Sequence, residues 1–288
     1  MLGQCGVSNK IDADTIFLHI GHGKTGSTYL QSAFALSESV LHSSGICYPM
    51  SEAHRETGSE SRIASGNADM LLSPDSVLAQ GNYYCRSFLF SNEGIFDDIR
   101  TYYSKVQEYF QYRRIKCLFF VRDPAEMIPS HWQQRVKRAG ETRPLGEWMG
   151  NDDLPCRVSN ALRELAACSD VETTIVNYSR HRDRLVGVTE GWLGVENGLL
   201  ITPGYSIVNR SLTAAELQFQ LEVNRQCTSE GAWFSDALCQ ELPSVATERI
   251  RVPRLPPLAP TLKSSATVTK PPDMIITPSP KLPTMKSP

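Results

Sequence analysis

The chain has no apolar run long enough to cross a membrane, and its first 14 residues lack the apolar core of a secretory signal. We therefore expect a soluble protein that acts in the cytoplasm. The eight cysteines are scattered without C-x-x-C spacing, which favours reduced structural thiols over a disulfide framework. The histidines also lack metal-ligand spacing, so we expect no metal.

A strong excess of one charge is absent as well, because 29 Lys and Arg face 31 Asp and Glu. The distribution is uneven: residues 243–288 hold eleven of the 18 prolines, and the charged side chains of this segment are mostly basic. Such a tail cannot bury enough apolar surface to order itself, so we expect it to be disordered or polyproline-like. The rest is mildly acidic, which argues against nucleic acid as the main partner. The expected organisation is a flexible stretch over 1–14, one domain over 15–242 and this tail.

Apolar strand-like runs alternate with helix-like segments, and no internal repeat is visible. We expect strands at 15–20, 46–48, 87–91, 117–121 and 171–176. We expect helices at 25–37, 95–112, 124–139, 156–167, 180–193 and 213–226. This order predicts an α/β fold with a central parallel sheet flanked by helices on both faces.

The most informative segment is 16–31, where an apolar strand, a glycine-broken turn and a new helix follow one another. Three glycines let the backbone turn tightly and bring its N–H groups close to an anion. They are Gly21, Gly23 and Gly26. Three hydroxyl donors stand at the positive end of the helix, namely Thr25, Ser27 and Thr28. With the cation of Lys24, the segment predicts a phosphate-binding loop rather than a plain glycine turn with a solvated lysine.

The spacing separates this loop from that of nucleotide triphosphatases. Their pattern, G-x-x-x-x-G-K-[ST], requires a glycine where Leu18 stands. The run from Lys24 to Thr28 instead resembles the 5′-phosphosulfate loop of sulfotransferases that use 3′-phosphoadenosine 5′-phosphosulfate (PAPS), in which Lys-[Thr/Ser]-Gly-[Thr/Ser]-[Thr/Ser] follows the first strand.

A second segment agrees with this resemblance. The apolar run 117–121 ends at Arg122, and Asp123 and Pro124 are suited to begin a helix. Ligands of open α/β sheets bind at the carboxyl edge, where Arg122 would lie. Sulfotransferases bind the 3′-phosphate of PAPS with an arginine at this place and a serine eight residues later, the separation of Arg122 and Ser130. A surface pair of Arg122 with an aspartate, and a serine bonded within its own helix, are the simpler alternatives.

Glu93 follows the strand 87–91 and is the candidate general base. A carboxylate in a partly desolvated site can accept the proton of the attacking hydroxyl, and bacterial members of the family commonly have Ser-x-Glu here. Alternatively, Glu93 stabilises the start of the helix near Ile95. His22, within the loop, is a rival base, whereas His19 lies inside the strand and is expected in the core.

Two later segments are less specific. Residues 208–216 resemble a family segment that precedes a late helix, where Arg210 would close over the nucleotide, although Thr213 and Glu216 also form a capping box. Tyr178 and the basic run after it follow a strand end, where an anionic or sugar substrate, or only solvent, would meet them.

We therefore interpret the chain as a PAPS-dependent sulfotransferase, resembling the bacterial carbohydrate-type members over residues 14–226, with a hydroxyl of a glycan or glycolipid as acceptor. The resemblance implies catalytic roles for Lys24, Glu93 and His22. It implies PAPS contacts from Gly23, Lys24, Thr25, Gly26, Ser27, Thr28, Arg122, Ser130 and Arg210. Two alternatives stay open: a nucleotide kinase or other P-loop phosphotransferase, and a nucleotide-binding protein without catalysis. The oligomeric state is not specified by the sequence.

Overall fold

The computed structural model describes residues 10–51, 66–73, 78, 84–203, 212–226 and 274–276. The chain divides into two units. The first comprises Met1–Val121, Arg157–Gly204 and Met274–Pro288, and the second comprises Arg122–Cys156 and Tyr205–Asp273.

The first unit is built on a six-stranded sheet with the order β2-β3-β1-β4-β5-β6. The strands are β1 (Ile11–Gly21), β2 (Ile46–Cys47), β3 (Ser87–Asn92), β4 (Phe110–Val121), β5 (Val171–Asn177) and β6 (Met274–Ile276). The first five are parallel to their neighbours and β6 is antiparallel to β5. Because Ile20 pairs with Asn92 and Gly21 with Phe120, the carboxyl ends of β3, β1 and β4 meet at one edge.

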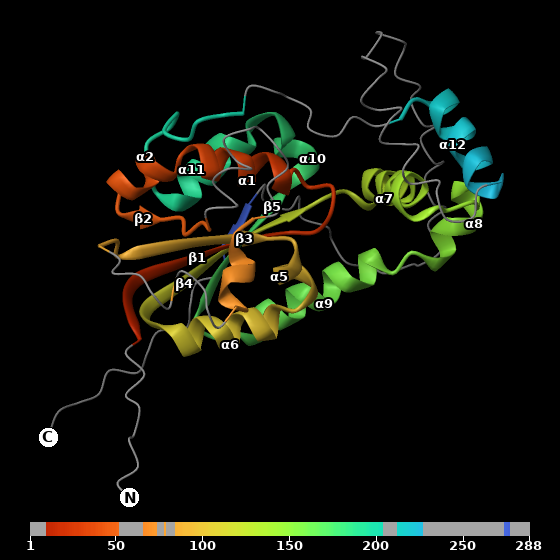
Figure 1. The fold of residues 1–288 in the computed structure, drawn as a ribbon. Coiled ribbons are helices and arrows are strands. Elements are labelled where there is room, and N and C mark those ends of the chain that lie inside the picture. The colour runs from red at the N-terminus through yellow and green to blue at the C-terminus, as the bar shows by residue number, and fades with distance from the viewer. Residues whose placement is uncertain are drawn as a thin grey trace, which may run out of the picture. The chain divides into compact units, whose positions relative to one another are not determined.

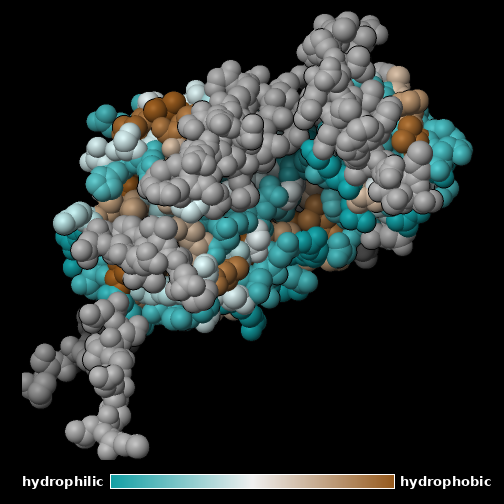
Figure 2. Space-filling model, in the orientation of Figure 1, coloured by the Kyte–Doolittle hydropathy of each residue, from teal (hydrophilic) through white to brown (hydrophobic). Residues whose placement is uncertain are grey.

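Helices cover both faces of this sheet, as predicted (Figure 1). One face carries α1 (Ser27–Leu36), α2 (Glu38–Ser43), α10 (Tyr178–His181) and α11 (Leu185–Leu193). The other carries α5 (Gly94–Asp97), α6 (Ile99–Tyr109) and α9 (Leu154–Ala167). Residues 157–167 of α9 belong to this unit. Short 3-10 turns of this unit are η1 (Ala68–Leu71) and η3 (Arg182–Arg184), while η2 (Met149–Asn151) belongs to the second unit. The side on which α6 and α9 lie is largely hydrophilic (Figure 2).

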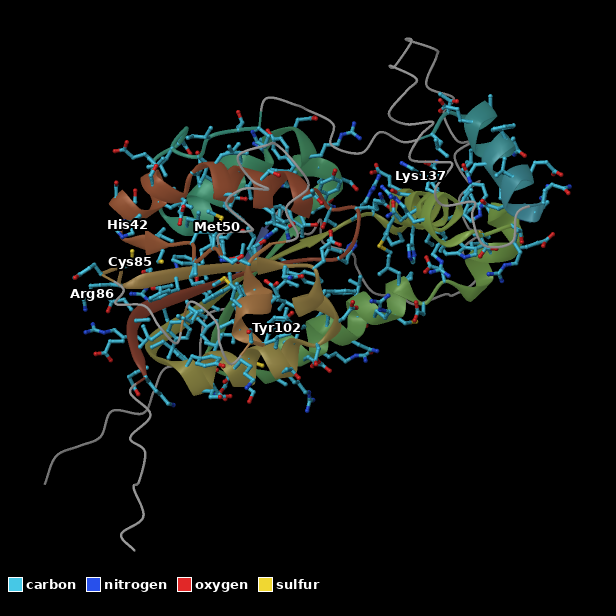
Figure 3. The ribbon with its side chains drawn as sticks, viewed as in Figure 1. His42, Met50, Cys85, Arg86, Tyr102 and Lys137 are labelled. Carbon is cyan, nitrogen blue, oxygen red and sulfur yellow. The ribbon has the colours of Figure 1, made fainter. Side chains whose placement is uncertain are left out.

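Alternate side chains of each strand form the two layers of the core. On the α1 side, Phe17, Leu89 and Phe120 pack with Phe34 of α1 and Trp192 of α11. Met50 belongs to the same cluster (Figure 3).

On the α6 side, the ring of Phe110 lies 4.9 Å from that of Phe88 and 5.9 Å from that of Phe90, measured between centroids. Tyr102 of α6 is buried in this layer (Figure 3). The five cysteines in the described part of the chain are free thiols: Cys47, Cys85, Cys117, Cys156 and Cys168.

The single helix expected over 95–112 differs from the structure in two places. It is broken at Asp98, which caps α6 by accepting from the Thr101 N–H at 3.2 Å, and it ends at Tyr109. Phe110 then opens β4, because it pairs with Ile11 of β1 and buries its ring among the phenylalanines of β3. Tertiary pairing therefore decides the conformation of a segment whose local pattern continues a helix.

Much of the expected tail lies outside the described residues, as do residues 1–9 and Arg210. Residues 274–276 are described, and they form β6 rather than a polyproline-like segment. Pairing with β5 supplies hydrogen-bond partners that an isolated tail lacks. The domain boundaries at 15 and 242 stay predictions, and β1 begins four residues earlier than the expected strand.

The second unit is helical where it is described. It contains α7 (Pro124–Ala139), α8 (Leu145–Trp148) and α12 (Ala214–Gln226). Apolar side chains of all three join one cluster, which includes Trp132, Trp148 and Leu221. The capping box at the start of α12 is confirmed, since the Thr213 N–H donates to Glu216 Oε2 at 2.7 Å and the Glu216 N–H to Thr213 Oγ1 at 3.3 Å. Over the described ranges, no helix has the length and apolar character needed to span a bilayer.

Candidate active site

The predicted phosphate loop lies in the first unit, between the last residue of β1, Gly21, and the first of α1, Ser27. Its backbone is left-handed at two positions, with φ of 73° at Lys24 and 78° at Gly26. Among the described residues, Lys24 is the one non-glycine with positive φ. A side-chain-bearing residue in this conformation marks a constrained turn, and such turns concentrate at functional sites.

Side-chain packing is a second reason, besides the left-handed backbone, why residue 26 must be a glycine. A Cβ there would lie 2.7 Å from Leu185 Cδ1 and 3.2 Å from Tyr178 Cε2. The start of α1 therefore rests directly against α10 and α11. The same contact places Tyr178, which the sequence predicted only at a strand end, against the loop.

Two of the three predicted hydroxyl donors already have partners within the protein. Thr25 is fully buried, and its Oγ1 donates to the carbonyl of His22 at 2.7 Å, which holds the turn closed. Ser27 is buried too, and its Oγ donates to Glu93 Oε1 at 2.5 Å. Thr28 is half-buried. The turn thus combines an internal brace at Thr25 with a hydroxyl at Ser27 whose partner is a charged group.

Glu93 is placed beside the loop, as the sequence predicted. It occupies the N-cap position of α5, yet its side chain makes no capping bond. Asn92 takes that role, because its Oδ1 accepts from the Gly94 N–H at 2.7 Å. Glu93 therefore does not stabilise α5 through a capping hydrogen bond, although its carboxylate lies at the N-terminus of the helix, where the helix dipole favours negative charge. The residue is exposed, so the protein by itself does not provide the partial desolvation that we expected around this carboxylate.

The two histidines of this region are both buried. His22 Nδ1 lies 3.0 Å from the carbonyl oxygen of Gly23, and the ring packs on Phe96 and Phe119 with centroids at 5.9 and 6.3 Å. A ring held among aromatic side chains is poorly presented to a substrate, so the geometry favours Glu93 as the base.

His19 lies in the core, as predicted, and its Nδ1 is 2.7 Å from the Oγ of Ser91. Burial lowers the pKa of His19 from 6.5 to about 3. Between pH 6.5 and about 3, His19 is therefore protonated in the unfolded chain and neutral in the folded chain, so the free energy of unfolding falls as the pH drops below 6.5. At neutral pH the ring is uncharged and serves as a structural link between β1 and β3.

In the second unit, the structure brings together the pair predicted for the 3′-phosphate. Arg122 Nη1 donates to Ser130 Oγ at 3.1 Å, and its Nε lies 3.5 Å from Glu126 Oε2. Asp123, proposed as its simpler partner, instead caps α7 by accepting from the Ala125 N–H at 2.8 Å. Sequence reasoning missed the pairing of Arg122, which lies just before α7, with Glu126 in the first turn of that helix.

Arg210 lies outside the described residues. The basic run after Tyr178 is spread over α10 and η3, where Arg184 Nε donates to His181 Nδ1 at 3.1 Å and Arg182 stays largely exposed. Among the described residues, no group of three or more His, Cys, Asp or Glu is arranged to hold a metal ion.

Comparisons with known proteins give structural likenesses only. No family model matches the sequence, and no curated protein does so either. The sulfotransferase domain of the olefin synthase of Synechococcus PCC 7002 is 14% identical, with a TM-score of 0.38 over 82% of this chain and 98% of that one. The sulfotransferase domain from the curacin biosynthetic pathway is 16% identical, with a TM-score of 0.37 over 81% and 100%.

A third similar structure is retinol dehydratase in complex with androsterone and the inactive cofactor PAP. It is 13% identical, with a TM-score of 0.33 over 78% of this chain and 69% of that one. At these identities and TM-scores the three likenesses carry no argument about this chain. The assignment of function depends on the chain's own residues.

The loop geometry predicts an asymmetry between two glycines. Gly26→Ala should lower the free energy of unfolding by about 2–4 kcal/mol, since it combines left-handed strain with overpacking against Leu185. Gly23→Ala, where a Cβ meets nothing within 4 Å, should change it by no more than about 0.5 kcal/mol. Urea unfolding of both variants measures the difference. Equal stability of the two would show that α1 is not seated on α10 and α11 as described.

Proposed function

We propose that the protein is a PAPS-dependent sulfotransferase. The observation that carries this proposal is the loop between β1 and α1: it has a left-handed lysine, exposes Gly23 and places a carboxylate on its serine. The loop N–H groups and Lys24 would bind the 5′-phosphosulfate, with support from the positive end of α1. Gly26 and Thr25 would shape the loop, while Ser27 and Thr28 would donate to the anion.

In the second unit, the pairing of Arg122 with Ser130 supports a role in binding a 3′-phosphate. A guanidinium already held by Glu126 and bonded to a hydroxyl has lost part of its rotamer freedom, which lowers the entropic cost of binding. The planar fork then matches two phosphate oxygens, and the serine hydroxyl adds a third donor. Arg210 is part of this proposal by resemblance alone.

In the reaction that we infer, the acceptor oxygen attacks sulfur in line and forms a new S–O bond. The bond between sulfur and the bridging oxygen breaks, and its electron pair stays on the 5′-phosphate of the departing adenosine 3′,5′-bisphosphate (PAP). Glu93 takes the hydroxyl proton, with the buried His22 as the weaker candidate. Lys24 and the loop N–H groups stabilise the charge that grows on the bridging oxygen. This transfer requires no metal.

The acceptor is proposed to be a hydroxyl of a glycan or glycolipid, and the place of action the cytoplasm. Both rest on the resemblance to carbohydrate-type members and on the absence of a membrane-spanning pattern in the sequence. A screen of hydroxyl acceptors with labelled PAPS identifies the class. A protein that binds PAP but transfers no label to any acceptor would be a nucleotide-binding protein without catalysis.

One observation favours a second candidate, a phosphotransferase. A loop serine beside a carboxylate at the end of the neighbouring strand is the arrangement with which P-loop enzymes hold Mg²⁺. Leu18, in place of the required glycine, argues against it. Magnesium separates the two readings: a phosphotransferase would bind ATP with Mg²⁺ and need the ion for turnover, whereas the sulfotransferase should bind PAP equally well in EDTA.

The 3′-phosphate site predicts nucleotide selectivity. PAP should bind about 100-fold more tightly than AMP, because one or two charge-assisted hydrogen bonds of this kind contribute about 1.5–3 kcal/mol each. Arg122→Ala should remove most of that preference. Arg113→Ala, which deletes an exposed arginine paired with Asp14, is the control and should leave it intact. Calorimetric titration decides, and equal affinities of the unmodified protein for PAP and AMP would refute the assignment.

Lys24 and Arg122 should fail in different ways. Lys24→Ala should lower kcat by about 10²–10³ with a smaller effect on the ground-state binding of PAPS, because its partner charge develops only as the S–O bond breaks. Arg122→Ala should weaken PAP binding as well, since the 3′-phosphate is charged throughout. Rates with labelled PAPS and titrations with PAPS and PAP test both, and Lys105→Ala on α6 serves as a control for lysine loss. A near-normal kcat in Lys24→Ala would exclude the loop as the transfer site.

A further inference from the structure

The hydrogen bond between Ser27 and Glu93 uses a proton that the donor nucleotide also needs. A serine hydroxyl has one proton and can donate it to one strong acceptor at a time. In the structure that acceptor is Glu93 Oε1, at 2.5 Å. In the proposed reaction it is an oxygen of the 5′-phosphosulfate. The two acceptors therefore compete for one donor.

The hydroxyl of Thr25 cannot replace that of Ser27 in this role. Thr25 is fully buried and spends its proton on the carbonyl of His22, inside the turn. Ser27 itself is tightly packed, because a Cβ on Gly21 would lie 3.2 Å from its Cβ and 3.3 Å from its Oγ. The strand end thus limits where Ser27 can turn, and Glu93 is the partner that must move.

Glu93 is suited to that movement. Its backbone is fixed at the end of β3, where Asn92 accepts from the Gly94 N–H, but the residue is exposed and its carboxylate has solvent to turn into. A carboxylate held at the loop also repels an incoming polyanion, since like charges at short range disfavour each other. Donor binding is therefore opposed until Glu93 leaves Ser27.

We propose that Ser27 couples donor binding to the general base: Glu93 is held on Ser27 while the loop is empty and is released toward the acceptor when the 5′-phosphosulfate takes the hydroxyl. Ser27 is a positioning residue in this scheme, and the inference rests on the proposed function. The base becomes available only when the donor is in place, and the repulsion is relieved in the same step. The Ser27 bond to Glu93 thus marks the empty state of the site.

The scheme has an unusual consequence for affinity: removing the catalytic charge should strengthen binding. Glu93→Gln keeps an oxygen that can accept from Ser27 but removes the repulsion, so PAP should bind about tenfold more tightly than to the unmodified protein. At the same time kcat should fall by about 10² or more through loss of the base. A matched control is Glu196→Gln, which removes an exposed carboxylate of the same unit and should change neither quantity.

Calorimetric titrations of the full chain with PAP, first in EDTA and then with Mg²⁺, provide the test. Tighter binding by Glu93→Gln alone supports the coupling. Unchanged or weaker binding by Glu93→Gln, with PAP still selected over AMP, overturns the coupling and leaves the sulfotransferase proposal standing. Binding that requires Mg²⁺ and weakens in Glu93→Gln overturns the coupling in favour of a metal-holding pair. Failure of every variant to bind PAP overturns both proposals.

Discussion

Hydrogen bonding of β1 to β3 on one side and to β4 on the other is the constraint on which the candidate site depends. Parallel pairing brings the carboxyl ends of the three strands to one edge, with Ile20 opposite Asn92 and Gly21 opposite Phe120. Residues more than sixty positions apart in the chain thereby become neighbours. Glu93 reaches Ser27 because both follow paired strands by only a few residues. A one-residue slip of β3 would turn every side chain of that strand to the other face and separate them.

The loop is braced by the protein's own polar groups. Thr25 closes the turn onto His22, and Glu93 holds Ser27, so the conformation does not wait for a ligand to form. Preorganised donors of this kind need little rearrangement when charge develops near them, which is the condition for electrostatic stabilisation of a transition state. In the proposed site the two hydroxyls would have different tasks: Thr25 maintains the turn, and Ser27 would be exchanged between Glu93 and the ligand.

Much of the fold could be predicted because its signals are local. Apolar runs, glycines and the Asp-Pro start of α7 predict the five parallel strands and most helices, although β4 begins seven residues before the strand expected at 117–121. The segment 110–112 was assigned to a helix because nothing local reveals its pairing with β1, and β6 was missed because its partner β5 lies about a hundred residues earlier. Long-range pairing is the information that the sequence pattern does not contain.

The same distinction applies to the candidate site. Motif spacing predicted that Arg122 and Ser130 lie together, and the structure places them within hydrogen-bonding distance. It did not predict which hydroxyl would be occupied by the protein itself, nor that Asn92 rather than Glu93 would cap α5. Those choices depend on distances of a few tenths of an ångström between side chains of different elements. They arise only after the strands have paired.

The central claim is that the turn from Gly23 to Thr28 is a cradle for the 5′-phosphate side of the nucleotide. A crystal structure of the protein with PAP tests it most directly. The account predicts the 5′-phosphate over the loop N–H groups, with Lys24 Nζ and Ser27 Oγ within hydrogen-bonding distance and Glu93 turned away from Ser27. A 5′-phosphate bound elsewhere, with the loop and the Ser27 bond to Glu93 unchanged, would contradict it.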